Sequence, residues 1–110
     1  AGLPRRTRPG APAVDAPFDG GWLLDRLGGD FALLAIGTEI PARIEEAGIA
    51  LRPLRVQDGA GDHGELLQRY LGDAPAAVYL IRPDQRVAAR WTSYDETEIR
   101  RSLRVATGRT

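Results

Sequence analysis

The chain has 110 residues, enough for one domain with its own core and too few for two. It contains no cysteine, which excludes disulfides, thiolate metal sites and dithiol redox chemistry. The 15 basic and 15 acidic residues give a formal net charge of zero, which argues against a nucleic-acid-binding surface.

Residues 1–17 show neither a helical nor a strand period. Prolines, small residues and an arginine cluster are typical of an extended segment. We predict a Pro/Arg-rich arm or linker over residues 1–17, either wrapped on a surface or loose, ahead of a domain over residues 18–110. Because the total charge is zero, we interpret the arginines as solvated. The prolines and arginines concerned are Pro4, Pro9, Pro12, Pro17, Arg5, Arg6 and Arg8.

The first predicted elements are a short helix and a buried strand. Asp19 can cap a helix over Trp22–Leu27, which Gly28 and the glycine after it would end. The segment Phe31–Ile36 is apolar at every position, as in strands that are buried on both faces of a sheet. We therefore expect this strand in the middle of a sheet.

A second helix and a second strand are predicted next. Thr38 is a suitable N-cap, Pro41 is tolerated in a first helical turn, and Gly48 would end the helix. The segment Leu51–Val56 then reads as a strand. Because Pro53 cannot donate a ladder hydrogen bond, this strand belongs at an edge of the sheet.

Two further helices begin with capping boxes, in which a glutamate follows the capping residue by three positions. Asp62 with Glu65 starts a helix that ends near residue 72, and Asp95 with Glu98 starts the last helix of the chain. Apolar residues recur on one face of each.

Between these two helices lies the strongest local pattern, a hairpin over Val78–Trp91. An apolar run is followed by a turn at residues 83–85, where proline sets φ and Asp84 can bond its own backbone. In the second strand one set of residues alternates with a more polar set, which predicts one buried and one wet face. The buried set is Val87, Ala89 and Trp91, and the wet set is Arg86, Ala88 and Arg90.

The order helix, strand, helix, strand, helix, strand, strand, helix predicts an α/β fold. A helical crossover makes the first two strands parallel, and the last two form an antiparallel hairpin. We expect a thioredoxin-like domain with a four-stranded mixed sheet in the order 2-1-3-4 and helices on both faces.

The position that carries the redox dithiol in this fold corresponds to residues 37–41, which contain no sulfur. Thr38 is interpreted as a helix cap, with anion binding as the alternative. Pro75 precedes the hairpin strand, as the cis-proline does in thioredoxins, and its cis or trans state stays open. His63, the only histidine, cannot form a metal site alone, and we predict no catalytic, cofactor-binding or metal-ligating residue.

The candidate interaction surfaces are the arm over Leu3–Pro17 and the wet face of the hairpin. Arginines flank its turn, and the tryptophan at its end either packs in the core or contacts another domain. The candidate residues are Arg82, Asp84, Arg86, Arg90 and Trp91.

The segment Arg82–Arg90 reads Arg-Pro-Asp-Gln-x-Val-Ala-x-Arg, and it resembles the closing motif of FAD-dependent aromatic-ring hydroxylases of the phenol hydroxylase type. The opening of the chain is similar to the opening of the same C-terminal domain. The segments that carry this second likeness are Arg8-Pro-Gly-Ala-Pro, Asp19-Gly, Leu24-Asp-Arg-Leu and Gly29-Asp-Phe-Ala-Leu-Leu. The resemblance covers nearly the whole chain.

The resemblance implies a C-terminal, thioredoxin-like accessory domain without a dithiol, which is not catalytic by itself. FAD and NAD(P)H are implied for the parent monooxygenase, and none is bound by this segment, because the family's dinucleotide and flavin motifs have no counterpart here. The implied partners are the N-terminal flavin-binding domain and, in a homodimer, a second copy. No membrane-length apolar run or signal peptide is visible, so we expect a cytoplasmic protein that binds neither membrane nor nucleic acid.

Two other functions stay open. A stand-alone, redox-inactive thioredoxin-like module would hold a small ligand or peptide near Thr38 and Pro75. An independent enzyme is disfavoured, because no nucleophile with a neighbouring base is visible. An upstream Gly-x-Gly-x-x-Gly domain in the same reading frame would distinguish the accessory domain from the stand-alone module.

Overall fold

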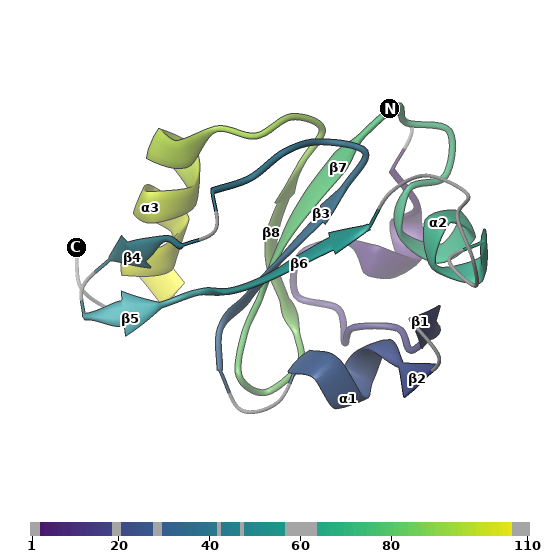
Figure 1. Cartoon of the computed structure of the whole chain (residues 1–110), viewed down its shortest axis with the longest axis horizontal. Helices are drawn as coiled ribbons and strands as arrows, with labels where there is room; N and C mark the ends of the chain where they lie inside the picture. The colour runs from purple at the N-terminus through teal and green to yellow at the C-terminus, as the bar shows by residue number, and fades with distance from the viewer. Residues whose placement is uncertain are drawn as a thin grey trace.

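The computed structural model describes residues 3–18, 21–27, 30–41, 43–46, 48–56 and 64–106, without the side chain of residue 46. Its centre is a four-stranded sheet in the order β6-β3-β7-β8, with parallel pairing between β6 and β3 and antiparallel pairing elsewhere (Figure 1). This confirms the predicted α/β class with a mixed four-stranded sheet. The strands are β3 (Ala32–Ile36), β6 (Arg52–Val56), β7 (Ala77–Ile81) and β8 (Val87–Trp91).

Both central strands, β3 and β7, are buried at every position because both faces of the sheet are covered. On one face Leu34 and Tyr79 pack with residues of α1 (Leu23–Leu27) and α2 (Gly64–Tyr70). On the other face Leu33 and Leu80 pack with α3 (Glu96–Ala106). Each of the two strands is apolar at successive positions because its side chains enter two separate cores, one on each face of the sheet.

The strand β6 lies at an edge of the sheet, as Pro53 predicts. Its arginines reach carboxylates on neighbouring segments: Arg52 lies 3.4 Å from Asp30, and Arg55 lies 2.7 Å from Glu39. Charged side chains and a proline keep such an edge from pairing with another strand.

The predicted helix between β3 and β6 is absent from the described residues, so Thr38 caps no helix there. Instead β4 (Glu45–Glu46) pairs with β5 (Ile49–Ala50) in a short antiparallel ladder. The apolar spacing that suggested a helix is satisfied otherwise, because Ile44 is buried in the core beside α3 and its carbonyl accepts a bond from Leu51. A helix over this segment would have only two isoleucines on its apolar face, and Pro41 would lie near its start. The β4–β5 ladder therefore stabilises the segment more than a short helix would.

The first helix is shorter than predicted. Trp22 lies in β2 (Gly21–Trp22), which pairs with β1 (Pro17–Phe18), and its side chain is 51% exposed. The predicted cap Asp19 and the stop at residues 28 and 29 fall outside the described residues. At the observed start of α1, Asp15 Oδ1 accepts a hydrogen bond of 3.1 Å from the Leu24 amide.

Capping at α3 is confirmed, since the Asp95 carboxylate accepts a 3.1 Å hydrogen bond from the Glu98 amide. For α2 the predicted cap Asp62 falls outside the described residues, whereas the helix itself and its end near residue 72 are observed. No helix within the described ranges is both long and apolar enough to cross a bilayer.

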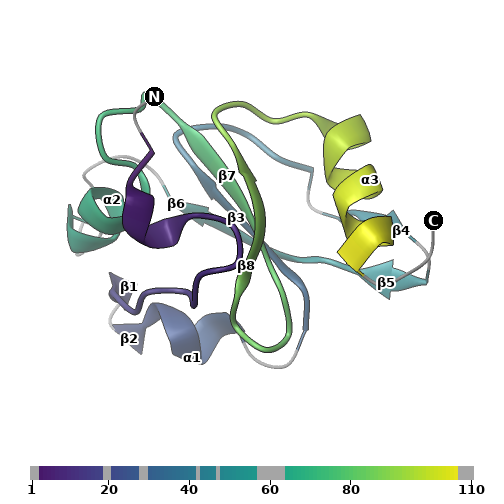
Figure 2. The same cartoon turned by 180° about the vertical axis from the view of Figure 1, so that it is seen from behind.

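The N-terminal arm, residues 3–16, is wrapped on the molecule. It forms a 3-10 turn, η1 (Arg5–Thr7), and then passes alongside the hairpin, where Figure 2 shows it in purple beside β8. Gly10 donates to the Val87 carbonyl at 2.7 Å, and Val87 donates to the Ala11 carbonyl at 2.9 Å. The arm therefore covers the turn-proximal part of the β8 edge through these bonds and an isolated antiparallel bridge between Pro12 and Arg86.

Candidate functional site: the hairpin and its arm

The hairpin turn is built as the sequence predicts. Arg82 and Arg86 close it with a main-chain bond of 2.8 Å, and the Asp84 carboxylate accepts a 3.3 Å bond from the Arg86 amide. Gln85 has a positive φ of 64°, and its side-chain amide donates to the Leu24 carbonyl at 3.1 Å. The turn is thus tied to the first turn of α1.

The predicted alternation along β8 is wrong, because the strand contains a β-bulge. Ile81 is opposite Val87 whereas Leu80 is opposite Ala89, so Ala88 is an extra residue without a partner on β7. After an extra residue the following side chains change faces. Val87 consequently packs in the core beneath the arm, while Ala89 and Trp91 pack on the α3 side.

The bulge also places Arg90 beneath the arm instead of on a wet face. Its guanidinium Nη1 donates to the Pro4 carbonyl at 2.5 Å and to Thr7 Oγ1 at 3.2 Å. Thr7 is fully buried, and its hydroxyl lies 2.7 Å from the Tyr79 hydroxyl. An arginine from β8 and a threonine from the arm therefore meet over the sheet.

The protons of this cluster can be assigned from its acceptors. Tyr79 donates its hydroxyl proton to the Tyr70 carbonyl at 2.6 Å, so Thr7 is the donor in its bond with Tyr79 and accepts from Arg90. The Tyr70 carbonyl belongs to the last turn of α2, where helical partners are missing. The result is a continuous chain of hydrogen bonds from β8 through the arm and β7 to α2.

Tyr70 connects the same helix to the arm a second time. Its ring meets that of Tyr79 edge-on at a centroid distance of 5.1 Å, and its hydroxyl donates to the Val14 carbonyl at 2.5 Å. Burial raises the pKa of Tyr70 far above its ordinary value. Tyr70 therefore keeps its proton at neutral pH and holds the arm in place through the Val14 carbonyl.

Of the five predicted surface residues, three lie together at the exposed turn, namely Arg82, Asp84 and Arg86, whereas Arg90 and Trp91 lie elsewhere. Arg86 donates to the Gly10 carbonyl at 3.1 Å and Arg90 lies under the arm, so both hold the arm. Arg82 and Asp84 pair with each other at 2.8 Å at the exposed tip. Trp91 is half-buried on the opposite face, against the core beside α3.

The positions of the missing dithiol and of Pro75 do come together. Gly37 follows β3 with a φ of +71°, and a Cβ atom there would lie 2.9 Å from the Pro75 carbonyl oxygen. The peptide bond before Pro75 is trans. Because no helix starts at the half-buried Thr38, the helix N-terminus that would have favoured an anion is absent from these residues.

A polar link that the sequence did not reveal joins α3 to β4. Tyr94 donates to Glu96 at 3.0 Å, Arg100 donates to the same carboxylate at 2.9 Å, and Arg100 also donates to the Glu45 carbonyl. The Arg100 guanidinium lowers the pKa of Glu96. Partial burial and the bond to Glu96 raise the pKa of Tyr94 to about 12.

His63, together with Asp58 and Asp62, falls outside the described residues. Within the described ranges, no three histidine, cysteine or acidic side chains are grouped so that they could hold a metal ion. Neither Thr7 nor its network could be found from sequence, since a single threonine in a proline-rich arm has no periodic partner.

Comparison with models of protein families, with characterised proteins and with solved structures finds no match to this chain.

Proposed function

We propose that the chain is the C-terminal accessory domain of an FAD- and NAD(P)H-dependent aromatic hydroxylase, and that it acts by contact instead of catalysis. Its proposed partner is the flavin-binding domain of the same cytoplasmic monooxygenase, with a second copy of the domain in a homodimer. The proposal begins from the resemblance of the Arg82–Arg90 segment and of the chain's opening to that family.

One observation carries the proposal. Two of the segments that carry the resemblance, Arg8–Pro12 and Arg82–Arg90, lie far apart in sequence and are bonded to each other in the fold. Gly10 and Ala11 pair with Val87 through main-chain bonds of 2.7 and 2.9 Å. These two segments therefore form one structural unit, the arm-covered hairpin, and this supports the proposal.

The thioredoxin-like identity is part of this proposal. Counted along the chain, the four core strands have the spatial order 2-1-3-4, with a parallel first pair and an antiparallel final hairpin. The helix that normally follows the first core strand is replaced here by the β4–β5 ladder. We interpret the domain as a thioredoxin-like scaffold that has lost its redox helix as well as its sulfur.

In the described part of the chain, the turn after β3 does not fit a flavin or nicotinamide dinucleotide. Such cofactors place their pyrophosphate on a glycine-rich turn at a helix N-terminus. The turn after β3 leads into no described helix, and the Pro75 carbonyl oxygen stands 2.9 Å from where a Gly37 Cβ would lie. FAD and NAD(P)H are therefore assigned to the parent protein's other domains, and no step of the reaction is placed here.

A stand-alone module that binds a ligand near Thr38 and Pro75 is the second candidate. The close approach of Gly37 to Pro75 disfavours it, because the space between them is filled by backbone atoms.

The reading frame that encodes the chain tests the proposal. We expect a Gly-x-Gly-x-x-Gly segment after a strand pattern upstream of residue 1 in the same frame. The purified 110 residues should remain colourless after incubation with FAD and gel filtration. A frame that encodes only this domain, or a yellow protein with a flavin spectrum, would contradict the proposal.

A further inference from the structure

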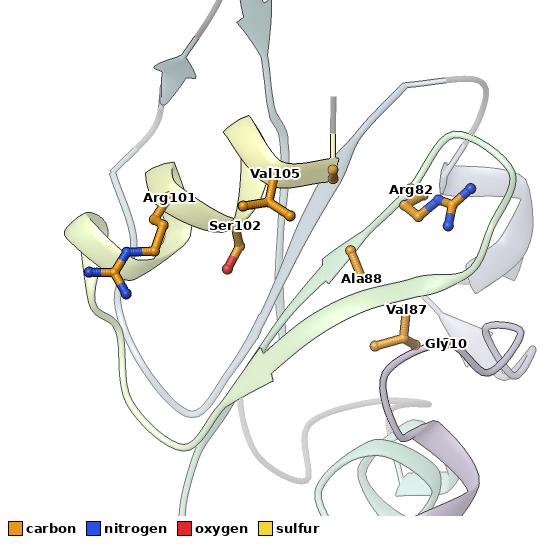
Figure 3. A pocket seen from close by; sticks show the side chains of 8 residues that line it. Gly10, Arg82, Val87, Ala88, Arg101, Ser102 and Val105 are labelled. Carbon is orange, nitrogen blue, oxygen red and sulfur yellow. The ribbon is translucent and has the colours of Figure 1, made fainter. Parts of the chain in front are cut away.

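A groove lies between the second half of α3 and the hairpin, and it borders the arm at Gly10. Its volume is about 310 Å³, and its lining comes from three segments: the arm at residue 10, the hairpin at residues 82, 87 and 88, and α3 at residues 101–106 (Figure 3). This volume is at the lower end of the range for ligand pockets. It suits one or two side chains of a protein segment better than a dinucleotide.

The floor of the groove is apolar. Val105 of α3 and Ala88 of β8 both line the groove, with Ser102 beside Val105 (Figure 3), whereas the Val87 side chain packs in the core beneath the arm. Val105 is 62% exposed, and in the described part of the chain only Trp22 is a second large apolar side chain with comparable exposure. Covering Val105 would remove apolar surface from water and is therefore favourable.

Each end of the groove carries an arginine that also forms an exposed ion pair with a carboxylate outside the lining. Arg82 and Arg101 stand on opposite sides, with their guanidinium groups turned outward (Figure 3), and no lining residue is acidic. Arg82 pairs with Asp84 at 2.8 Å and Arg101 with Glu98 at 3.6 Å, and all four side chains are between 42% and 65% exposed. Exposed pairs of this kind are weak, so each guanidinium can also donate hydrogen bonds to a second carboxylate.

The charge along α3 reinforces this arrangement. The acidic residues of the helix, Glu96 and Glu98, are in its first turn, whereas the half that lines the groove carries Arg101 and Arg104. An apolar floor between two cationic ends is complementary to an apolar side chain between carboxylates. The neutral total charge and the apolar floor favour a protein segment over a nucleic acid.

We propose that this groove docks an acidic protein segment in which one or two bulky apolar side chains are flanked by aspartate or glutamate. The apolar side chains cover Val105 and Ala88, and the carboxylates bond Arg82 and Arg101. This inference does not depend on the flavin enzyme, because it follows from the groove alone.

NMR titration of the full chain with a short blocked peptide, Gly-Glu-Asp-Leu-Phe-Asp-Glu-Gly, tests the proposal. We expect amide shifts at Ala88, Ser102 and Val105 with a Kd on the order of 0.1–1 mM. Val105→Gln and Arg101→Gln should each weaken binding by about fivefold or more. Raising the ionic strength from about 0.05 to about 0.3 M should weaken binding several-fold as well.

Matched controls separate this groove from non-specific attraction. Arg55→Gln removes a paired arginine from β6 at the other edge of the sheet, and Trp22→Ser removes the other exposed large apolar side chain. Both should change the Kd by less than about twofold. The inference is overturned if the acidic peptide causes no shift at millimolar concentration or if a lysine-substituted peptide binds equally well. It is equally overturned if an oligothymidine shifts the same amides as strongly, or if the control variants weaken binding as much as Val105→Gln does.

Discussion

Thr7, Tyr79 and Arg90 form a buried polar chain in which each hydroxyl both donates and accepts a hydrogen bond. Buried polar groups of this kind stabilise a fold when every member is satisfied, and they are costly when one partner is lost. The attachment of the arm thus depends on individual atoms as well as on apolar contact.

Tyr79→Phe tests this dependence. The substitution keeps the ring but removes the donor to the Tyr70 carbonyl and the acceptor of the Thr7 proton, both in buried surroundings. We expect the free energy of unfolding, measured by urea denaturation, to fall by about 2–3 kcal/mol. Tyr94→Phe is the control, because its hydroxyl bonds the exposed Glu96, and it should cost less than about 0.5 kcal/mol. Equal losses for the two variants would contradict the assigned network.

The two tyrosines with raised pKa values predict a stability change at high pH. The folded pKa of Tyr94 is about 12, above its ordinary value near 10, and that of Tyr70 is raised further by burial. A raised folded pKa stabilises the fold fully below the unfolded pKa, and this contribution is lost as pH rises through the folded value. Stability should therefore decrease from about pH 10 upward. Absorbance at the tyrosinate band should rise later in native than in urea-unfolded protein, and coincident titrations would contradict the prediction.

Some of the residue-level chemistry could be predicted from sequence. The bond from Asp84 to its own turn and the cap at Asp95 follow from local rules, and both are observed. The roles of Arg90 and Thr7 could not be predicted, since they depend on where a distant arm is placed. A salt-bridged or solvated arginine and a buried arginine under an arm have the same sequence signature.

At the scale of elements, the turn after β3 is fixed by its closeness to the start of the hairpin. Gly37 has positive φ and faces the Pro75 carbonyl, which leaves no room for a side chain. This contact positions the first core strand relative to the segment that leads into β7.

Gly37→Ala should therefore destabilise the fold through both backbone strain and collision, by about 2–4 kcal/mol in urea denaturation. Gly10→Ala is the matched control. Gly10 also has positive φ, +91°, but a Cβ there meets nothing within 4 Å, so only the strain of about 1 kcal/mol remains. Equal losses in the free energy of unfolding for the two variants would show that the close approach of Gly37 to the Pro75 carbonyl does not contribute to stability.

The strongly patterned elements were predictable, and the weakly patterned ones were not. The apolar runs of β3 and β7 and the capping box of α3 specify their elements locally. The segment between β3 and β6 carries only two isoleucines at helical spacing. The structure of this segment is instead decided by the burial of Ile44 in the core beside α3. The bulge at Ala88 is a one-residue shift that no alternation pattern could locate, and it reversed the faces assigned to β8.

For the whole molecule, the arm is an integral part of the packed domain, because it is bonded to the hairpin beside the sheet. Its residues are bonded to the hairpin at Gln85 and Val87, and Ala13 and Ala16 contribute to the core. The predicted boundary at residue 17 marks a change in amino-acid composition, but residues on both sides of it pack in the same core.

Hydrogen exchange tests whether the arm stays docked. The Val87 amide donates outward to the Ala11 carbonyl at 2.9 Å, away from β7, so its protection depends on the arm. We expect the Val87 amide to exchange with a free energy of opening close to that of the β7 amides. Rapid exchange at Val87 beside protected β7 amides would show that the arm detaches without global unfolding.

The proposed role as an accessory domain is tested most directly by the product that cells make from the native gene. The measurement is the mass and visible absorbance spectrum of that product, purified with an antibody against these 110 residues. We predict a longer polypeptide that ends in this domain and carries bound flavin. A colourless polypeptide no longer than this domain would contradict the proposed role.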